Sequence, residues 1–152
     1  MDTIHDICKR YGIENYTING DGSIDVNGDV DLIEEELFKL PLTFNKVTGW
    51  FDCSNNRLTT LKGSPKWIGG FFTCGNNRLT SLEFSPDYVG DDFYCDNNKL
   101  TDNLCDTEIG GDFYTTLKQD GLIINNINIA TNYKDWRKMY KRKKILNDIF
   151  NM

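Results

Sequence analysis

Hydrophobic residues recur along the middle of the chain with a fixed period of 21 residues. Three segments, 51–61, 72–82 and 93–101, match in register, and each begins Phe-x-Cys-x-Asn-Asn-(Arg/Lys)-Leu-Thr. Self-similarity at such a period is the signature of a solenoid, in which each repeat forms one coil. A degenerate copy starts near Ile24, and a copy shortened by one residue starts at Ile109. About five repeats therefore occupy residues 24–126.

The start of each repeat alternates between apolar and other residues, which predicts a half-buried strand. In one coil Val47, Gly49, Phe51 and Cys53 are two residues apart and would share the inward face. We therefore predict one strand per coil, with strands of successive coils paired in parallel about 4.8 Å apart. The Asn-Asn pair that follows predicts a bend, in which stacked side-chain amides satisfy one another in a ladder.

A single coil cannot bury its own apolar face, so the coils must stack and both ends of the stack need caps. Residues 2–11 place apolar side chains on one helical face, and a second helical pattern runs from Asn132 to Phe150. We predict a single domain over 1–152: an N-terminal helical cap and turn (1–23), the repeats (24–126) and a C-terminal capping helix (127–152). The predicted fold class is an α/β repeat solenoid with a parallel β-sheet on one face and helical caps at both ends.

The repeat core resembles a known family. The pattern Phe51-x-Cys53-x-x-Asn56-x-Leu58-x-x-Leu61 looks like the core of leucine-rich repeats, and its 21-residue period looks like the short repeats of bacterial secreted effectors. More closely, nearly the whole chain resembles leucine-rich-repeat proteins of tailed phages. It departs from the usual pattern in the residues that precede the strand. The resemblance implies a role in binding, and it implies no substrate or reaction.

Charge is divided unevenly along the chain, whose net charge is −6. Residues 1–130 contain 10 Lys and Arg against 21 Asp and Glu, whereas residues 131–152 contain 7 against 2. An acidic body argues against a main surface that tracks phosphates, because such surfaces place Lys and Arg on the nucleic-acid backbone. The run Lys141, Arg142, Lys143 and Lys144 leaves nucleic-acid association as an alternative, although adjacent charges on a helix are more typical of a solvated face.

The residues that could carry catalysis or bind a metal are better explained by the fold. His5 is the single histidine, and no nucleophile motif lies near it. Cys53, Cys74 and Cys95 are predicted to form an inward packing column rather than a metal site. Residues 19–25 resemble part of a calcium loop but lack its acidic residues at both ends, so we predict a turn. We expect a non-enzyme with no catalytic, cofactor-binding or metal-binding residues.

The sequence also favours a cytoplasmic protein. No apolar run approaches the roughly 20 residues that cross a bilayer, and the N-terminus lacks the pattern of a secretory signal. The five cysteines include no CxxC pair, which fits a reduced compartment. We expect the cytoplasm, that of the host if the chain is phage-encoded, and no membrane association; the oligomeric state stays open.

The outward side of the predicted sheet is the candidate site. Large aromatic side chains on a solenoid sheet suit protein docking, and carboxylates around them steer a basic or mixed-charge partner. The predicted partner-binding residues are Trp50, Phe71, Tyr94, Tyr114, Asp52 and Asp92. We therefore predict a protein–protein interaction module that binds a host or defence protein and inhibits or redirects it. The alternatives are nucleic-acid association through the basic helix and a structural component of a particle.

Overall fold

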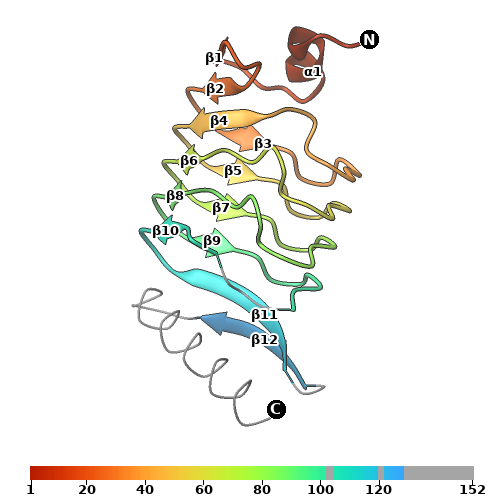
Figure 1. Cartoon of the computed structure of the whole chain (residues 1–152), viewed down its shortest axis with the longest axis vertical. Coiled ribbons are helices and arrows are strands. Elements are labelled where there is room, and N and C mark those ends of the chain that lie inside the picture. The colour runs from red at the N-terminus through yellow and green to blue at the C-terminus, as the bar shows by residue number, and fades with distance from the viewer. Residues whose placement is uncertain (102–104, 120–121, 129–152) are drawn as a thin grey trace.

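The computed structural model describes residues 1–101, 105–119 and 122–128, which form a β-solenoid of about four turns (Figure 1). Two six-stranded sheets run along its long axis. In spatial order, sheet A contains β1 (Tyr16–Ile18), β2 (Ile24–Val26), β4 (Phe44–Val47), β6 (Trp67–Ile68), β8 (Tyr88–Val89) and β10 (Glu108–Ile109). Sheet B contains β3 (Val30–Asp31), β5 (Phe51–Asp52), β7 (Phe72–Thr73), β9 (Phe93–Tyr94), β11 (Phe113–Gln119) and β12 (Leu122–Asn128).

The 21-residue repeat is confirmed by the pairing register of sheet B. Phe51 pairs with Phe72, and Phe72 pairs with Phe93. The next step, from Phe93 to Phe113, is shorter by one residue, as the shortened last copy predicts. All four rings are fully buried and contact one another along the axis. Equivalent side chains of successive coils therefore form columns, and this places every outward residue directly beside its counterpart in the next coil.

The prediction of one strand and one sheet was wrong, because a corner divides each predicted strand in two. Val47 ends β4 in sheet A and Phe51 begins β5 in sheet B. Glycines form the corner: a Cβ added to Gly90 would collide with the carbonyl oxygen of Gly69 in the preceding coil. Only glycine lets the backbones approach so closely. Alternation of apolar residues could not reveal the corner, because Val47 and Phe51 point inward on either side of it.

The described residues do not show the helical caps that the sequence predicts at both ends. The described chain is almost all strand, with one short helix, α1 (Ile4–Arg10), which a capping box of Thr3 and Asp6 begins. Each sheet ends in an antiparallel strand, β1 on β2 in sheet A and β12 on β11 in sheet B. Residues 127–128 belong to β12, and the rest of the predicted C-terminal helix lies outside the described residues.

The second asparagine of each pair holds neighbouring coils together. These residues are Asn56, Asn77 and Asn98. In the middle one, Asn77 Oδ1 accepts a hydrogen bond from Leu58 N at 2.9 Å, and its Nδ2 donates to Cys53 O at 3.0 Å. The predicted amide-to-amide ladder is therefore wrong for the inward row, which bonds to backbone groups that the bend leaves without strand partners. In the outward row an amide does meet an amide, where Asn97 Nδ2 donates to Asn76 Oδ1 at 2.8 Å.

Candidate docking surface

The aromatic residues predicted for docking lie in two stacked pairs along sheet B. Trp50 and Phe71 have ring centroids 5.4 Å apart and planes 3° apart. Tyr94 and Tyr114 are 4.5 Å apart with planes 7° apart. The register causes the stacking, since Trp50 and Phe71 immediately precede β5 and β7, while the tyrosines lie within β9 and β11. All four side chains are half-buried, because each ring covers one face of its neighbour.

Asp92 belongs to this surface, as predicted from the sequence. Its Oδ2 accepts a hydrogen bond from the Tyr94 hydroxyl at 2.9 Å, and its Oδ1 accepts one from Asp112 N at 2.7 Å. Burial, followed by the bond to Asp92, raises the pKa of Tyr94 to about 12. Asp112 takes the same position one coil later, with an oxygen 3.4 Å from the Tyr114 hydroxyl. Both tyrosines therefore stay protonated, and each tyrosine hydroxyl group contacts an aspartate carboxylate at the surface.

Asp52 is less suited to the role predicted for it. Only 9% of it is exposed, and its Oδ1 accepts hydrogen bonds from Ser54 N at 2.8 Å and from the Ser54 hydroxyl at 2.6 Å. Burial raises the pKa of its carboxyl group, and the bonds from Ser54 oppose that rise. Asp52 therefore serves the bend after β5 more than the surface. An aspartate followed two residues later by serine is a signal for such a turn.

Two exposed carboxylates that the predicted set leaves out lie in the coil before Trp50. Asp29 is one coil before Trp50, and its Oδ1 accepts a hydrogen bond from Trp50 N at 2.9 Å. Asp31 in β3 is also exposed, and its Oδ1 accepts one from Ile33 N at 3.1 Å. The 21-residue spacing places both in the same columns as the predicted residues, so the repeat contained the signal for them.

Between Asp29 and Tyr114, the outward residues of sheet B and of the positions just before its strands carry one sign of charge, and we call this surface the acidic aromatic face. Its outward residues include no Lys or Arg, and they are Asp29, Asp31, Trp50, Phe71, Thr73, Asp92, Tyr94, Asp112 and Tyr114. A partner with a basic surface would meet attractive charge over the whole face.

Sheet A carries a third aromatic stack that was not predicted. Trp67 and Tyr88 have ring centroids 5.4 Å apart and planes 15° apart. The Nζ of Lys46, one coil earlier, lies 4.8 Å from the centroid of the Trp67 ring. Lys46, Trp67 and Tyr88 pair in register in the sheet, and their 21-residue spacing could have revealed the column. Here the chain supplies its own cation to an outward aromatic stack.

The residues weighed for other chemistry have structural roles where the structure describes them. Cys53, Cys74 and Cys95 are fully buried, and burial raises the pKa of each thiol, so the predicted packing column is confirmed. His5 Nδ1 lies 2.5 Å from the hydroxyl of Tyr16. Residues 19–23 form the predicted turn, and Ile24 and Asp25 begin the strand β2 that follows it. Within the described ranges, no group of three or more potential metal ligands is found.

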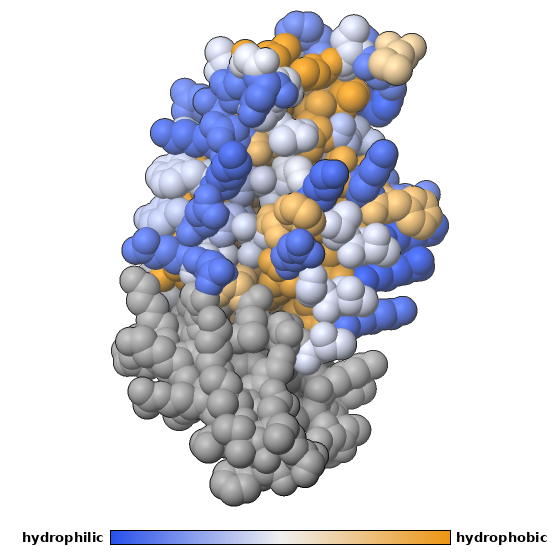
Figure 2. All heavy atoms as spheres, in the orientation of Figure 1, coloured by the Kyte–Doolittle hydropathy of each residue, from blue (hydrophilic) through white to orange (hydrophobic). Residues whose placement is uncertain are grey.

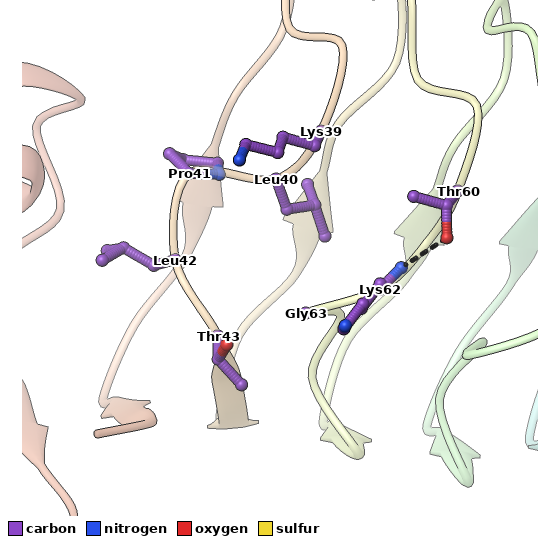
Figure 3. A pocket seen from close by; sticks show the side chains of 8 residues that line it. All are labelled: Lys39, Leu40, Pro41, Leu42, Thr43, Thr60, Lys62 and Gly63. Carbon is purple, nitrogen blue, oxygen red and sulfur yellow. Dashed lines mark hydrogen bonds between the residues drawn. The ribbon is translucent and has the colours of Figure 1, made fainter. Parts of the chain in front are cut away.

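A separate hollow lies on the turns that lead into sheet A. Its volume is about 470 Å³, and Figure 3 shows the side chains around it. The lining residues are Lys39, Leu40, Pro41, Leu42, Thr43, Thr60, Lys62 and Gly63. Figure 2 shows hydrophobic atoms between hydrophilic margins on one long side of the solenoid. None of the predicted site residues lines this hollow, so the candidate surface and the hollow are distinct.

Comparisons with family models, with curated proteins and with solved structures gave no match. Within the part of the chain that the structure describes, no helix is long and apolar enough to cross a bilayer. The basic run at residues 141–144 lies outside the described residues.

Proposed function

We propose that this chain is a non-enzymatic binding module that docks a protein with a basic or mixed-charge surface on its acidic aromatic face. The observation that carries the proposal is the pair of outward aromatic stacks among the carboxylates of Asp29, Asp31, Asp92 and Asp112. Trp and Tyr are the residues that most often dominate binding energy at protein interfaces. Their rings offer a large contact area and lose little conformational freedom on binding.

The fold supports this role because it fixes the rings before a partner arrives. Backbone pairing between coils sets the spacing of each stack, and Trp50 N is tied to Asp29 while the Tyr94 hydroxyl is tied to Asp92. The entropic cost of ordering this surface on binding would therefore be small. The carboxylates would accelerate encounter with a basic partner, and this contribution would weaken as salt rises.

The biological setting of the proposal comes from the sequence resemblance to phage leucine-rich-repeat proteins. In that setting the chain acts in the cytoplasm of an infected cell, where it binds a host or defence protein and inhibits or redirects it. The structural features of the docking face are consistent with this setting and are independent of it.

The test compares two double variants that remove equivalent stacks from opposite sheets. Trp50→Ala with Phe71→Ala removes a stack from the acidic aromatic face, whereas Trp67→Ala with Tyr88→Ala removes the stack from sheet A. Tagged proteins are used to capture partners from bacterial lysate at low and high salt, after circular dichroism has shown that each variant is folded. We expect a protein partner that the sheet A variant and the unmodified chain retain and the sheet B variant loses.

Two results would contradict the proposal. Equal capture of the same protein by both double variants would place the docking surface elsewhere. Recovery of nucleic acid in place of protein would favour the basic run at residues 141–144 instead.

A further inference from the structure

The two sheets carry the same kind of aromatic stack, and only one of the stacks has its own cation. Along sheet A the column runs Asp25, Lys46, Trp67, Tyr88 and Glu108. Along the column, a carboxylate is followed by a cation, then by two stacked rings, and then by a second carboxylate. The Lys46 ammonium group covers the end of the stack, 4.8 Å from the Trp67 centroid.

The equivalent column beside sheet B runs Asp29, Trp50, Phe71, Asp92 and Asp112. It has two stacked rings with a carboxylate on either side, and an aspartate stands where sheet A has Lys46. Because the two ring planes are only 3° apart, the outer face of Trp50 is turned along the axis toward the coil of Asp29. Within the described ranges, the cation–π contacts involve the rings of Trp67 and Phe38, and neither ring belongs to this face.

Negative charge is concentrated at this end of the stack. Asp29 and Asp31 are exposed on either side of Val30, and Asp31 pairs in register with Asp52 of the next coil. Asp29 and Asp31 each use one carboxylate oxygen, Oδ1, to accept a backbone hydrogen bond. A cation placed over Trp50 would meet an aromatic face and two carboxylates at once, which is the arrangement that favours arginine.

We propose that the Trp50 end of the acidic aromatic face is a receptor for an arginine side chain of the protein partner. The guanidinium group stacks on the outer face of Trp50 and pairs with Asp29 and Asp31, so that the partner supplies the cation that Lys46 supplies on sheet A. The planar guanidinium suits the ring face and both carboxylates better than an ammonium group does. This inference rests on the proposed function and names the chemical group that the docking face recognises.

The test is a titration of the ¹⁵N-labelled full-length chain with two short peptides. One is Gly-Ser-Arg-Gly-Arg-Ser-Gly, and the other contains citrulline, which has nearly the same shape and no charge, at both arginine positions. The chain contains three tryptophans, and their indole N–H signals are assigned from single Trp→Phe variants. We expect the arginine peptide to shift the Trp50 signal in a salt-sensitive way and to leave the Trp67 signal in place. The citrulline peptide should shift neither.

Charge-removing variants that keep the backbone bonds then test the carboxylates. Asparagine retains an oxygen that can accept from Trp50 N or Ile33 N, so Asp29→Asn with Asp31→Asn removes charge and preserves the local fold. We expect peptide affinity to fall about fivefold or more in this double variant, since each exposed ion pair is typically worth a factor of about two to five. Glu83→Gln with Asp87→Asn removes equal charge away from the face and should leave affinity within about twofold.

The inference is overturned if the two peptides bind equally, if the Trp50 signal does not move, or if both double variants bind the arginine peptide equally. Those results would leave the docking face itself standing, provided that the Trp50→Ala and Phe71→Ala variant still loses its partner. Unchanged capture by that variant would instead remove the proposed function, whatever the peptides do.

Discussion

Phe84 occupies a backbone conformation that its own repeat assigns to glycine. Its φ is +66°, and the residue one coil earlier, Gly63, has a φ of +96°. This left-handed conformation costs about 1–2 kcal/mol for a residue with a Cβ and almost nothing for glycine. Glycine also gives the unfolded chain more freedom, which costs about 0.4–1 kcal/mol of stability. The backbone at position 84 should therefore favour glycine over alanine by about 0.5–1 kcal/mol.

The comparison of Phe84→Gly with Phe84→Ala isolates this backbone effect. Both variants lose the ring, which is 52% exposed, so the loss of its packing cancels between them. The free energy of unfolding, measured by urea denaturation followed by circular dichroism, should be higher for the glycine variant. In a chain of this size a difference of 1 kcal/mol corresponds to about 2–4 °C in Tm.

The neighbouring Glu83, an exposed residue whose φ is not positive, is the matched control. There alanine should be the more stable substitution, by about 0.5–1 kcal/mol. The sign of the glycine–alanine difference must therefore reverse between positions 83 and 84. If alanine were as stable as glycine at position 84, the argument from backbone strain would be refuted.

Three further predictions follow from contacts within and between the coils. Gly90→Ala should lower the free energy of unfolding by about 2 kcal/mol or more, because the new Cβ collides with the Gly69 carbonyl. Gly20→Ala, which has open space around the added Cβ, should change the free energy of unfolding little. Urea denaturation of the two variants tests this difference. Asn77→Ala should cost about 1–3 kcal/mol, because it leaves the buried Leu58 N without its acceptor and removes one of the two side-chain amide bonds to Cys53 O. Asn77→Asp, which keeps the acceptor and loses the donor, should also be destabilising. Equal stability of either variant and the parent chain in urea denaturation would refute the bridging role. The pKa of Tyr94 in the folded chain is raised from 10.0 to about 12, so its contribution to stability is complete below pH 10 and is lost as pH rises through 12. Absorbance at 295 nm should show a tyrosine that ionises late, and Tyr94→Phe should remove this late step. An unchanged titration in that variant would contradict the assignment.

Much of the fold could be predicted because the repeat carries its own register. The 21-residue spacing of Phe51, Phe72 and Phe93 fixes which side chains stack, and the shortened last copy was visible as a missing residue before Phe113. The corner between the sheets could not be predicted from apolar alternation, which is the same for one long strand and for two strands joined at a bend. The close approach of Gly90 to Gly69 depends on the spacing of whole coils, which no single repeat displays.

The candidate site was predicted in its aromatic part and less well in its carboxylates. The column positions of Trp50 and Phe71 follow directly from the period, so their stacking was accessible from the sequence. Whether an aspartate faces the surface depends on local hydrogen bonds, and those turn Asp52 toward Ser54 while Asp29 stays exposed. The Trp67 and Tyr88 stack was missed because those residues precede the corner and belong to sheet A.

The inward asparagines give the solenoid a direction. The amide of Asn77 reaches back to Leu58 N and Cys53 O, and the amide of Asn98 reaches back to Leu79 N in the same way. Each bend is thus completed by the coil that comes after it in the sequence. During synthesis, the bend of each coil would lack these hydrogen bonds until the next coil had left the ribosome. The coils would therefore fold in sequence order, each one completed when the following coil emerges.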